Sequence, residues 1–284
     1  MDILTLYAAQ GDLAAVRSGG EAIIVDAHMP ECDDVTPQQI EQALAVYLQG
    51  MRVRGMILTG LDRDHACPAG VASVLASYTP DWVMYPKYYK DTDAASEVFD
   101  TIARHVSRRA NSNRPLARVS VSVDRMHKAS LVGLAPTFDF QLFSPHTEDM
   151  DCSNNSGIVV KITGLDATGF SYLVTGDTEV PRWERINSIF GDSLRSHVLS
   201  APHHGSKTGV HIPSLLKISP NTVLISAGVD NSYGHPDGQA VAVYQRTAKH
   251  VFSTNADGGV CLLTRPKGSD FTTTLVKHVP LRAA

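Results

Sequence analysis

The sequence lacks long apolar runs, a cysteine framework and a basic leader, and each absence excludes a class of protein. None of its 284 residues lies in a run of about 18 apolar residues, so we expect no membrane-spanning helix and no membrane partner. The cysteines Cys32, Cys67, Cys152 and Cys261 include no Cys-x-x-Cys pair, which argues against zinc-finger and redox motifs. The start carries Asp2 and no basic segment, so we expect no signal peptide, thiols that are reduced rather than paired, and a cytoplasmic location.

The chain also lacks an excess of basic charge. Lys and Arg number 25 against 29 Asp and Glu, and the net charge of −4 argues against a protein that coats nucleic acid by bulk charge. One segment differs, because Arg104 to Lys128 holds seven basic residues and the single acid Asp124, and Lys87-Tyr88-Tyr89-Lys90 precedes it. Such a segment is typical of a single-stranded nucleic-acid track, or it is the solvated face of a helix followed by a basic loop.

Strand and helix patterns interleave along the chain, which predicts an α/β or α+β fold. No Pro/Gly/Ser-rich linker interrupts them, so we expect a single domain over residues 1–284. Thr36 and Pro37 are an N-cap and first residue of a helix. Further helices are expected at 70–78, 93–109 and 239–248. Strands are expected at 3–8, 13–17, 21–26, 55–59, 81–85, 119–123, 158–162, 172–175, 198–200 and 223–226, with a closing hairpin that turns at Asp257-Gly258-Gly259.

Histidine is abundant, with 12 residues, and several follow predicted strands. Four segments share one design, a short apolar strand followed by an abrupt loop of Asp, His and Gly: 58–65, 173–179, 198–207 and 224–237. Side chains at strand ends are held rigidly and point into a common crevice. Carboxylate oxygen and imidazole nitrogen together suit Zn²⁺, Mn²⁺ or Fe.

The first two loops offer carboxylates. Asp62 and Asp64 point the same way in an extended chain, and Asp64 and His65 serve one metal only across a tight turn. The alternative is a solvated acidic turn. Asp177 follows a buried strand and is either a metal ligand or the N-cap of a helix that includes Trp183.

The other loops offer imidazoles and amides. In the pair His203 and His204, one ring would bind metal and the other would form hydrogen bonds, with Lys207 as a nearby cation. His235 is a ligand, a general acid or a turn residue. Asn154 and the adjacent Asn155 either hold a substrate oxygen or stabilise a turn.

In this order the motifs resemble the ComEC-like branch of the metallo-β-lactamase superfamily, the soluble domain found in DNA-uptake channel proteins and in free-standing proteins. The resemblance covers nearly the whole chain and implies an αββα sandwich of two mixed sheets flanked by helices. The matching segments are Gln10-Gly11-Asp12, a strand ending in Asp26, Asp62-x-Asp64-His65, Asn154-Asn155-Ser156, Gly176-Asp177-x-Glu179, His203-His204-Gly205-Ser206 and Tyr233-Gly234-His235-Pro236.

One departure bears on the metals that the resemblance implies. The branch begins its acidic loop with His, and this chain has Gly60 there. One metal would keep Asp64, His65, Asp177 and one of His203 and His204. The other would rely on Asp62, Asp177 and His235. We therefore expect one firm Zn²⁺ or Mn²⁺ site and a second, weaker one.

The resemblance also implies a hydrolase, namely a phosphodiesterase or nuclease in which a metal-bound hydroxide attacks a phosphoester of DNA, RNA or a nucleotide. The alternatives are a non-catalytic binding or regulatory module with the same fold, and a hydrolase of another ester or amide. The implied catalytic residues are Asp64, Asp177, His204, Lys207 and His235. The implied substrate contacts are Asn154, Asn155, Ser156, Ser206, Lys207 and Tyr233.

Overall fold

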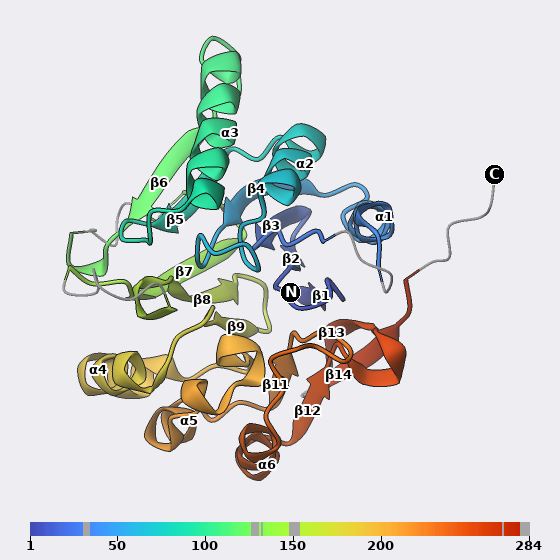
Figure 1. The fold of residues 1–284 in the computed structure, drawn as a ribbon, viewed down its shortest axis with the longest axis vertical. Coiled ribbons are helices and arrows are strands. Elements are labelled where there is room, and N and C mark those ends of the chain that lie inside the picture. Colours follow the sequence, from blue (N-terminus) through green and yellow to red (C-terminus); the bar gives the residue numbers. More distant parts are fainter. Residues whose placement is uncertain (31–34, 126–130, 132, 148–153, 269, 279–284) are drawn as a thin grey trace.

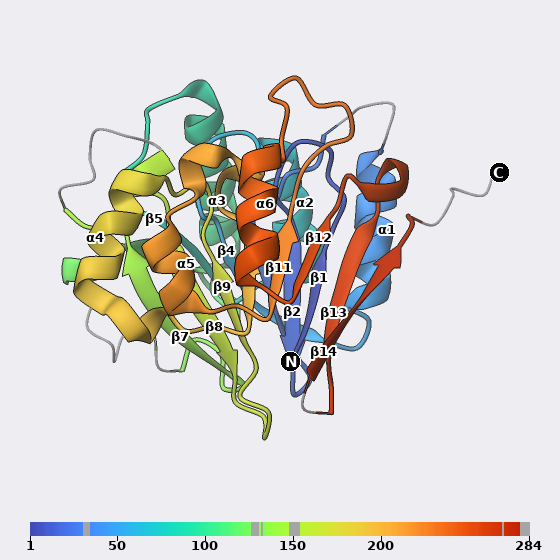
Figure 2. The same cartoon turned by 90° about the horizontal axis from the view of Figure 1, so that it is seen from below.

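Two β-sheets pack face to face in the computed structural model, and helices cover the outer face of each (Figures 1 and 2). The structure describes residues 1–30, 35–125, 131, 133–147, 154–268 and 270–278. The first sheet has eight strands, in the order β14 (Asp270–Val276), β13 (Cys261–Lys267), β1 (Asp2–Thr5), β2 (Ala14–Ser18), β3 (Glu21–Val25), β4 (Arg52–Ile57), β5 (Trp82–Pro86) and β6 (Ala117–Val121). The second has six, in the order β12 (His250–Ser253), β11 (Thr222–Ile225), β10 (Val198–Ser200), β9 (Ser171–Val174), β8 (Val159–Gly164) and β7 (Phe138–Ser144).

The helices divide between the two sheets according to their place in the sequence. The first sheet carries α1 (Pro37–Tyr47), α2 (Pro68–Tyr78) and α3 (Asp93–Arg109), and the second carries α4 (Val180–Phe190), α5 (Ile212–Ile218) and α6 (Gly238–Thr247) (Figure 1). A short 3-10 helix at Asn154–Ser156 precedes β8, and two more, at Pro202–Gly205 and Lys207–Gly209, follow β10. Within the described part of the chain, none of the helices has the length and apolar character needed to cross a membrane.

Three layers of apolar side chains hold this sandwich together. On β3, Ile24 packs in the layer under α1 and α2, whereas its neighbour Ile23 packs in the layer between the sheets. Successive strand residues point to opposite faces, so a strand that is buried on both sides reads as a continuous apolar run. Trp183 and Tyr244 belong to the third layer, between the second sheet and its helices. The expected αββα arrangement of two mixed sheets is confirmed.

Parallel pairing determines where the candidate residues lie. Strands β3 to β6 run parallel to one another, and so do β9 to β12. The carboxyl ends of parallel strands lie at the same edge of a sheet, where crevices form. The loops after β4, β9, β10 and β11 carry the four segments of Asp, His and Gly.

The predicted position of the closing hairpin is wrong. Asp257-Gly258-Gly259 does not join two paired strands, because it leads from β12 in the second sheet to β13 in the first. Gly258 and Gly259 have positive φ angles of 75° and 101°, which let the chain turn between the sheets. The hairpin is formed by β13 and β14 instead. Strand β7 and helix α5 were not predicted.

Candidate metal centre

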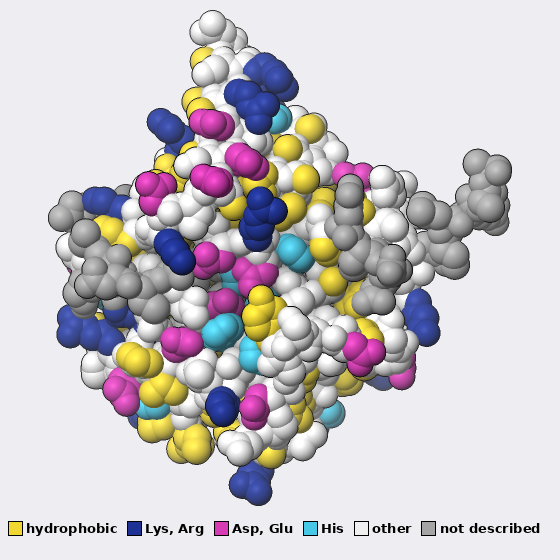
Figure 3. Space-filling view, viewed as in Figure 1, with side chains coloured by type: hydrophobic (Ala, Val, Ile, Leu, Met, Phe, Trp, Pro, Cys, Tyr) yellow, Lys and Arg dark blue, Asp and Glu magenta, His cyan; other side chains and the backbone are white. Residues whose placement is uncertain are grey.

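A polar cavity of about 240 Å³ opens at the carboxyl edge of the sheets. His and acidic side chains gather at the centre of this face of the molecule (Figure 3). The residues lining the cavity are Gln10, Asp62, Asp64, Asn154, Asp177, His203, His204, Tyr233 and His235. Eight of these nine, all except Gln10, were predicted as site residues, so the four strand-end loops do converge as expected.

The loop after β4 is held by Asp26, at the end of β3. The Asp26 carboxylate accepts hydrogen bonds from the Thr59 backbone N–H at 2.6 Å and from the Thr59 hydroxyl at 2.7 Å. It also lies 3.1 Å from Nδ1 of His65. Because a carboxylate only accepts, Nδ1 of His65 carries the proton and its Nε2 offers a lone pair to the cavity side.

The loop after β9 places Asp177 in the site and not at a helix terminus. The N-cap of α4 is Glu179, so the alternative that Asp177 caps this helix is excluded. Gly176 precedes it with φ of 49°, and a Cβ there would lie 2.9 Å from the hydroxyl oxygen of Thr59. Glycine is therefore required for the loops after β4 and β9 to pack together.

The loop after β10 presents two histidines in an uncommon backbone conformation. His203 and His204 have φ angles of 51° and 53°, in the left-handed region that non-glycine residues seldom adopt. His204 is buried, and its Nδ1 lies 3.0 Å from the carbonyl oxygen of Ser226. A carbonyl only accepts, so Nδ1 donates and Nε2 of His204 is left free for a ligand.

Three buried atoms meet at the floor of the cavity without hydrogen-bond partners: Nε2 of His65, Oδ1 of Asp177 and Nε2 of His204. Oδ1 of Asp177 lies 3.0 Å from Nε2 of His65 and 3.6 Å from Nε2 of His204, close in distance but not aligned as hydrogen bonds. The ligand atoms of tetrahedral zinc lie about 3.4 Å apart, given bonds of about 2.1 Å. The spacing and the mixed N/O donor set therefore fit a divalent cation.

Charge is strongly concentrated around these atoms. Burial alone would lower the pKa of His204, but Asp12, Asp177 and Asp64 outweigh it and raise the pKa to about 9. Burial likewise opposes the charged form of His65, yet the surrounding carboxylates hold its pKa well above the usual value. Burial would raise the pKa of Asp177, but His65 and His204 lower it below the usual range. The histidines and the carboxylates thus stabilise each other's charged forms.

Asp12 is the acidic residue of the site that the sequence did not assign. Its ligand atoms group with those of His65, Asp177 and His204, all within 4.8 Å of one another. Its carboxylate lies 3.5 Å from Nδ1 of His65 and 3.8 Å from Nδ1 of His204, behind both rings. Burial raises its pKa despite the two histidines. The Gln10-Gly11-Asp12 motif was the signal available in the sequence, and it was not given a role.

The remaining predicted ligands surround this group. Oδ2 of Asp64 lies 3.4 Å from Nε2 of His204. His203 is half-buried, with Nε2 3.8 Å from Oδ2 of Asp177 and Nδ1 3.3 Å from Glu179. Nδ1 of His235 is buried without a hydrogen-bond partner, and burial, followed by the charges of His203 and His204, lowers its pKa. Asp62 and His235 line the same cavity.

The predicted substrate contacts divide into two groups. Asn154 and Tyr233 line the cavity. Asn155 instead accepts the Glu179 backbone N–H at 3.0 Å, and so ties its own loop to the loop after β9. Four predicted residues, Asn155, Ser156, Ser206 and Lys207, are not among those lining the cavity. Ser156 is buried, Ser206 accepts the Thr208 backbone N–H, and Lys207 is exposed on a short 3-10 helix.

Gly60 leaves space where the resemblance implies a histidine. A Cβ at this position would lie 3.5 Å from the His65 ring, an ordinary contact distance, and the backbone has no positive φ. The fold thus has room for a Cβ at position 60, and the histidine is missing there only because the sequence has a glycine.

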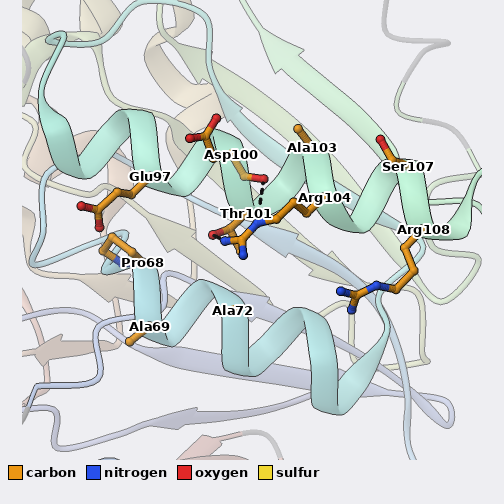
Figure 4. Close-up of a pocket in the computed structure, with 10 residues that line it drawn as sticks. All are labelled: Pro68, Ala69, Ala72, Glu97, Asp100, Thr101, Ala103, Arg104, Ser107 and Arg108. Atoms are coloured by element: carbon orange, nitrogen blue, oxygen red, sulfur yellow. Dashed lines mark hydrogen bonds between the residues drawn. The ribbon is translucent and has the colours of Figure 1, made fainter.

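The described residues of the basic segment do not line the cavity, and several of them make internal contacts. Arg114 pairs with Asp81 at 2.9 Å, and Arg109 donates to the Pro80 carbonyl at 2.7 Å. Arg104 and Arg108 line a separate hollow of about 920 Å³ between α2 and α3, which shares no lining residue with the site (Figure 4). Lys128 lies outside the described residues. For Arg109 and Arg114 the structure favours a structural role over a nucleic-acid track.

Comparison with known proteins supports the same fold. No family model matches the chain. ComE operon protein 3 of Bacillus subtilis (strain 168) is 25% identical over 223 residues, which cover 78% of this chain and 26% of that protein. The chain thus spans about a quarter of the length of this relative.

Two solved structures resemble the whole chain. Igni18, a metallo hydrolase from Ignicoccus hospitalis, has a TM-score of 0.52 at 13% identity and covers 94% of this chain and 100% of its own. The metallo-beta-lactamase fold protein YhfI of Bacillus subtilis has a TM-score of 0.51 at 13% identity and covers 92% of this chain and 99% of its own. The chain has the metallo-β-lactamase fold, and its sequence is similar to part of ComE operon protein 3.

Proposed function

We propose that this chain is a metal-dependent hydrolase that cleaves a phosphodiester of DNA, RNA or a nucleotide. The observation that carries the proposal is that Nε2 of His65, Nε2 of His204 and Oδ1 of Asp177 lie together without hydrogen-bond partners, beside a polar cavity that Asp177 and His204 line. Buried polar atoms without partners are costly, so their presence together in one place points to a ligand that satisfies all three.

Two unequal metal positions follow from the residues present. His65, Asp177 and His204, with Asp64, would hold the firm site for Zn²⁺ or Mn²⁺. Asp62, Asp177 and His235 would hold a weaker one, because Gly60 supplies no ligand. A bound divalent cation would polarise a phosphoryl oxygen and lower the pKa of its water.

The carboxylates of the cavity suit this substrate class only together with a cation. Asp62, Asp64 and Asp177 line the space that a phosphoryl group would enter, and they would repel it. Cation binding and phosphoester binding are therefore coupled in this proposal. Asn154, at the cavity wall, would donate its amide N–H to a phosphoryl oxygen.

His203 is the proposed proton donor to the leaving oxygen. Glu179 lies 3.3 Å from its Nδ1 and the Thr208 hydroxyl lies 3.2 Å away, and these two contacts orient the ring. Nε2 then faces the cavity beside Asp177. A histidine that another side chain orients and that can reach the reacting group fits general acid catalysis.

A metal-dependent phosphodiesterase assay tests the function. Purified protein, stripped and reloaded with Mn²⁺ or Zn²⁺, should hydrolyse nucleoside phosphodiesters and lose activity with a chelator. Asp177→Ala and His204→Ala should lose both metal and activity. His105→Ala, on α3 and away from the cavity, is the matched control and should keep both.

The second candidate is a binding module without turnover, which the missing ligand at Gly60 favours. That function would show metal and nucleotide binding by the wild-type protein, with no hydrolysis of phosphodiesters or of other esters and amides at any metal concentration.

A further inference from the structure

Tyr233 is an exposed aromatic side chain at the mouth of a polar site. It is 72% exposed, the most exposed of the large hydrophobic side chains of the described residues. It also lines the cavity that holds Asp177, His203 and His235. Several apolar side chains of the molecule are similarly exposed, but Tyr233 is the one among them that lines this cavity, so its ring is available to a ligand bound there.

The loop that carries Tyr233 is held by Asn231. The Asn231 side chain accepts the backbone N–H of Tyr233 at 3.2 Å and that of His235 at 3.0 Å. Its amide N–H groups donate to the carbonyl oxygens of Gly228, at 2.9 Å, and His235, at 2.5 Å. The Asn231 side chain thus makes four hydrogen bonds that close the turn. The loop rises above the strand ends between β11 and α6 (Figure 2).

The ring is supported from one side. The rings of Tyr233 and His235 lie nearly parallel, at 16°, with centroids 6.0 Å apart. The ring of His203 lies 5.7 Å from that of His235, so an aromatic series leads from the rim to the site. With one face toward His235 and most of its surface exposed, Tyr233 offers its outer face to a planar ligand group.

A second aromatic region adjoins the cavity at Asp62. Asp62 lines the cavity and also borders a small hollow formed with Tyr88, Tyr89 and Lys90, on the loop before α3. Tyr89 is 41% exposed. An aromatic side chain and a cation therefore border the cavity next to Asp62, which suits a substrate that carries planar groups and phosphates.

We propose that Tyr233 is a stacking platform that selects phosphoesters bearing a nucleobase next to the scissile bond. This inference rests on the proposed function, because it assumes that the phosphoester lies over Asp177. Stacking on an aromatic side chain tolerates any base, since each has a planar face. It increases affinity by about 5- to 150-fold per base. The selection would therefore be for nucleotides as a class and not for a sequence.

Two substrates with the same leaving group test this inference. Thymidine 5′-(p-nitrophenyl phosphate) and methyl p-nitrophenyl phosphate differ only in the presence of the nucleoside. The wild-type protein should prefer the nucleoside ester in kcat/KM by about tenfold or more. Tyr233→Ala should reduce this ratio toward one, mainly through KM, and Tyr233→Phe should retain it. Leu165→Ala, which removes another exposed apolar side chain, is the control and should leave the ratio unchanged.

The outcomes separate this inference from the proposed function. Hydrolysis of both esters with a ratio that Tyr233→Ala does not change overturns the stacking role and keeps the phosphodiesterase. If neither ester is hydrolysed, the proposed function fails, and binding of thymidine 5′-monophosphate to the metal-loaded protein, followed by NMR, decides the stacking role. Binding that weakens about tenfold in Tyr233→Ala and persists in Tyr233→Phe supports it. Equal binding to all three proteins, or none to the wild type, overturns it.

Discussion

The carboxylate of Asp26 lies 3.1 Å from Nδ1 of His65, although the two residues are 39 positions apart in the chain. Asp26 has a left-handed φ of 57°, at the end of β3, and His65 follows a turn after β4. This contact fixes which nitrogen of His65 faces the cavity. Asp26, which does not itself line the cavity, therefore determines which nitrogen of His65 is available to a metal.

Replacing Asp26 should weaken metal binding more than it weakens the fold. In Asp26→Asn the amide keeps the shape of the side chain but loses the charge that orients His65. Loss of such a supporting carboxylate reduces metal affinity by about 10- to 100-fold. Competition with a chromogenic chelator measures this affinity. Asp192→Asn, at an exposed carboxylate away from the site, is the control, and equal affinities of the two variants would contradict the role of Asp26.

Restoring the missing histidine should strengthen the weaker metal position. Gly60→His places a Cβ 3.5 Å from the His65 ring, an ordinary contact distance, and requires no left-handed backbone conformation. We expect a second equivalent of metal in titration calorimetry. Gly60→Ala tests whether the added Cβ alone has any effect. An unchanged stoichiometry in Gly60→His would show that Gly60 is not the reason for a weak site.

Substitution of Gly176 by alanine should destabilise the protein more than the same substitution at Gly169, a glycine with a similar backbone conformation. Gly176→Ala combines a φ of 49° with a Cβ 2.9 Å from the Thr59 hydroxyl oxygen, whereas Gly169 has a φ of 55° and open space. We expect Gly169→Ala to cost about 1 kcal/mol in free energy of unfolding. Gly176→Ala should cost about 2 kcal/mol more, because the loops after β4 and β9 must separate. Urea unfolding of both variants measures the difference, and equal costs would contradict the contact.

Acid should remove stability that Asp81 supplies. Burial would raise the pKa of Asp81, but Arg114, Arg52 and Arg54 outweigh it and hold the pKa below the usual value. A lowered folded-state pKa stabilises the protein above the unfolded value of about 3.9, and this stability is lost as the pH falls through the folded value. Asp81→Asn should therefore lower the free energy of unfolding by about 1 kcal/mol at pH 7. The difference from the wild type should shrink toward pH 3, and a constant difference would contradict the charge effect.

Local patterns were sufficient for most elements and for the loops of the site. The apolar runs of β3 and β4 and the Thr36-Pro37 start of α1 can be recognised without tertiary information, and α1 begins where predicted. The turn at Gly258 and Gly259 was recognised, but a turn does not reveal which sheet the next strand joins. That choice depends on long-range pairing, in this case of β13 with β1.

Prediction of the site from the sequence was limited in the same way, by contacts between distant parts of the chain. Asp64, His65, Asp177 and the pair His203 and His204 were predicted because each follows a strand, and the carboxyl ends of parallel strands share an edge. The choice between His203 and His204 stayed open because it depends on ring direction, and the carbonyl of Ser226, just after β11, sets the direction of the His204 ring. Asp12 was not assigned because it precedes β2 and reaches the rings from behind, through contacts between distant loops.

The central claim is that His65, Asp177 and His204 bind a divalent cation. Its most direct test is elemental analysis of the wild-type protein after equilibrium dialysis against micromolar Zn²⁺ or Mn²⁺, beside Asp177→Ala, His204→Ala and the control His105→Ala. We predict about one firmly held metal ion per wild-type and control chain and none in the two site variants. A wild-type protein that retains no metal under these conditions would contradict the account.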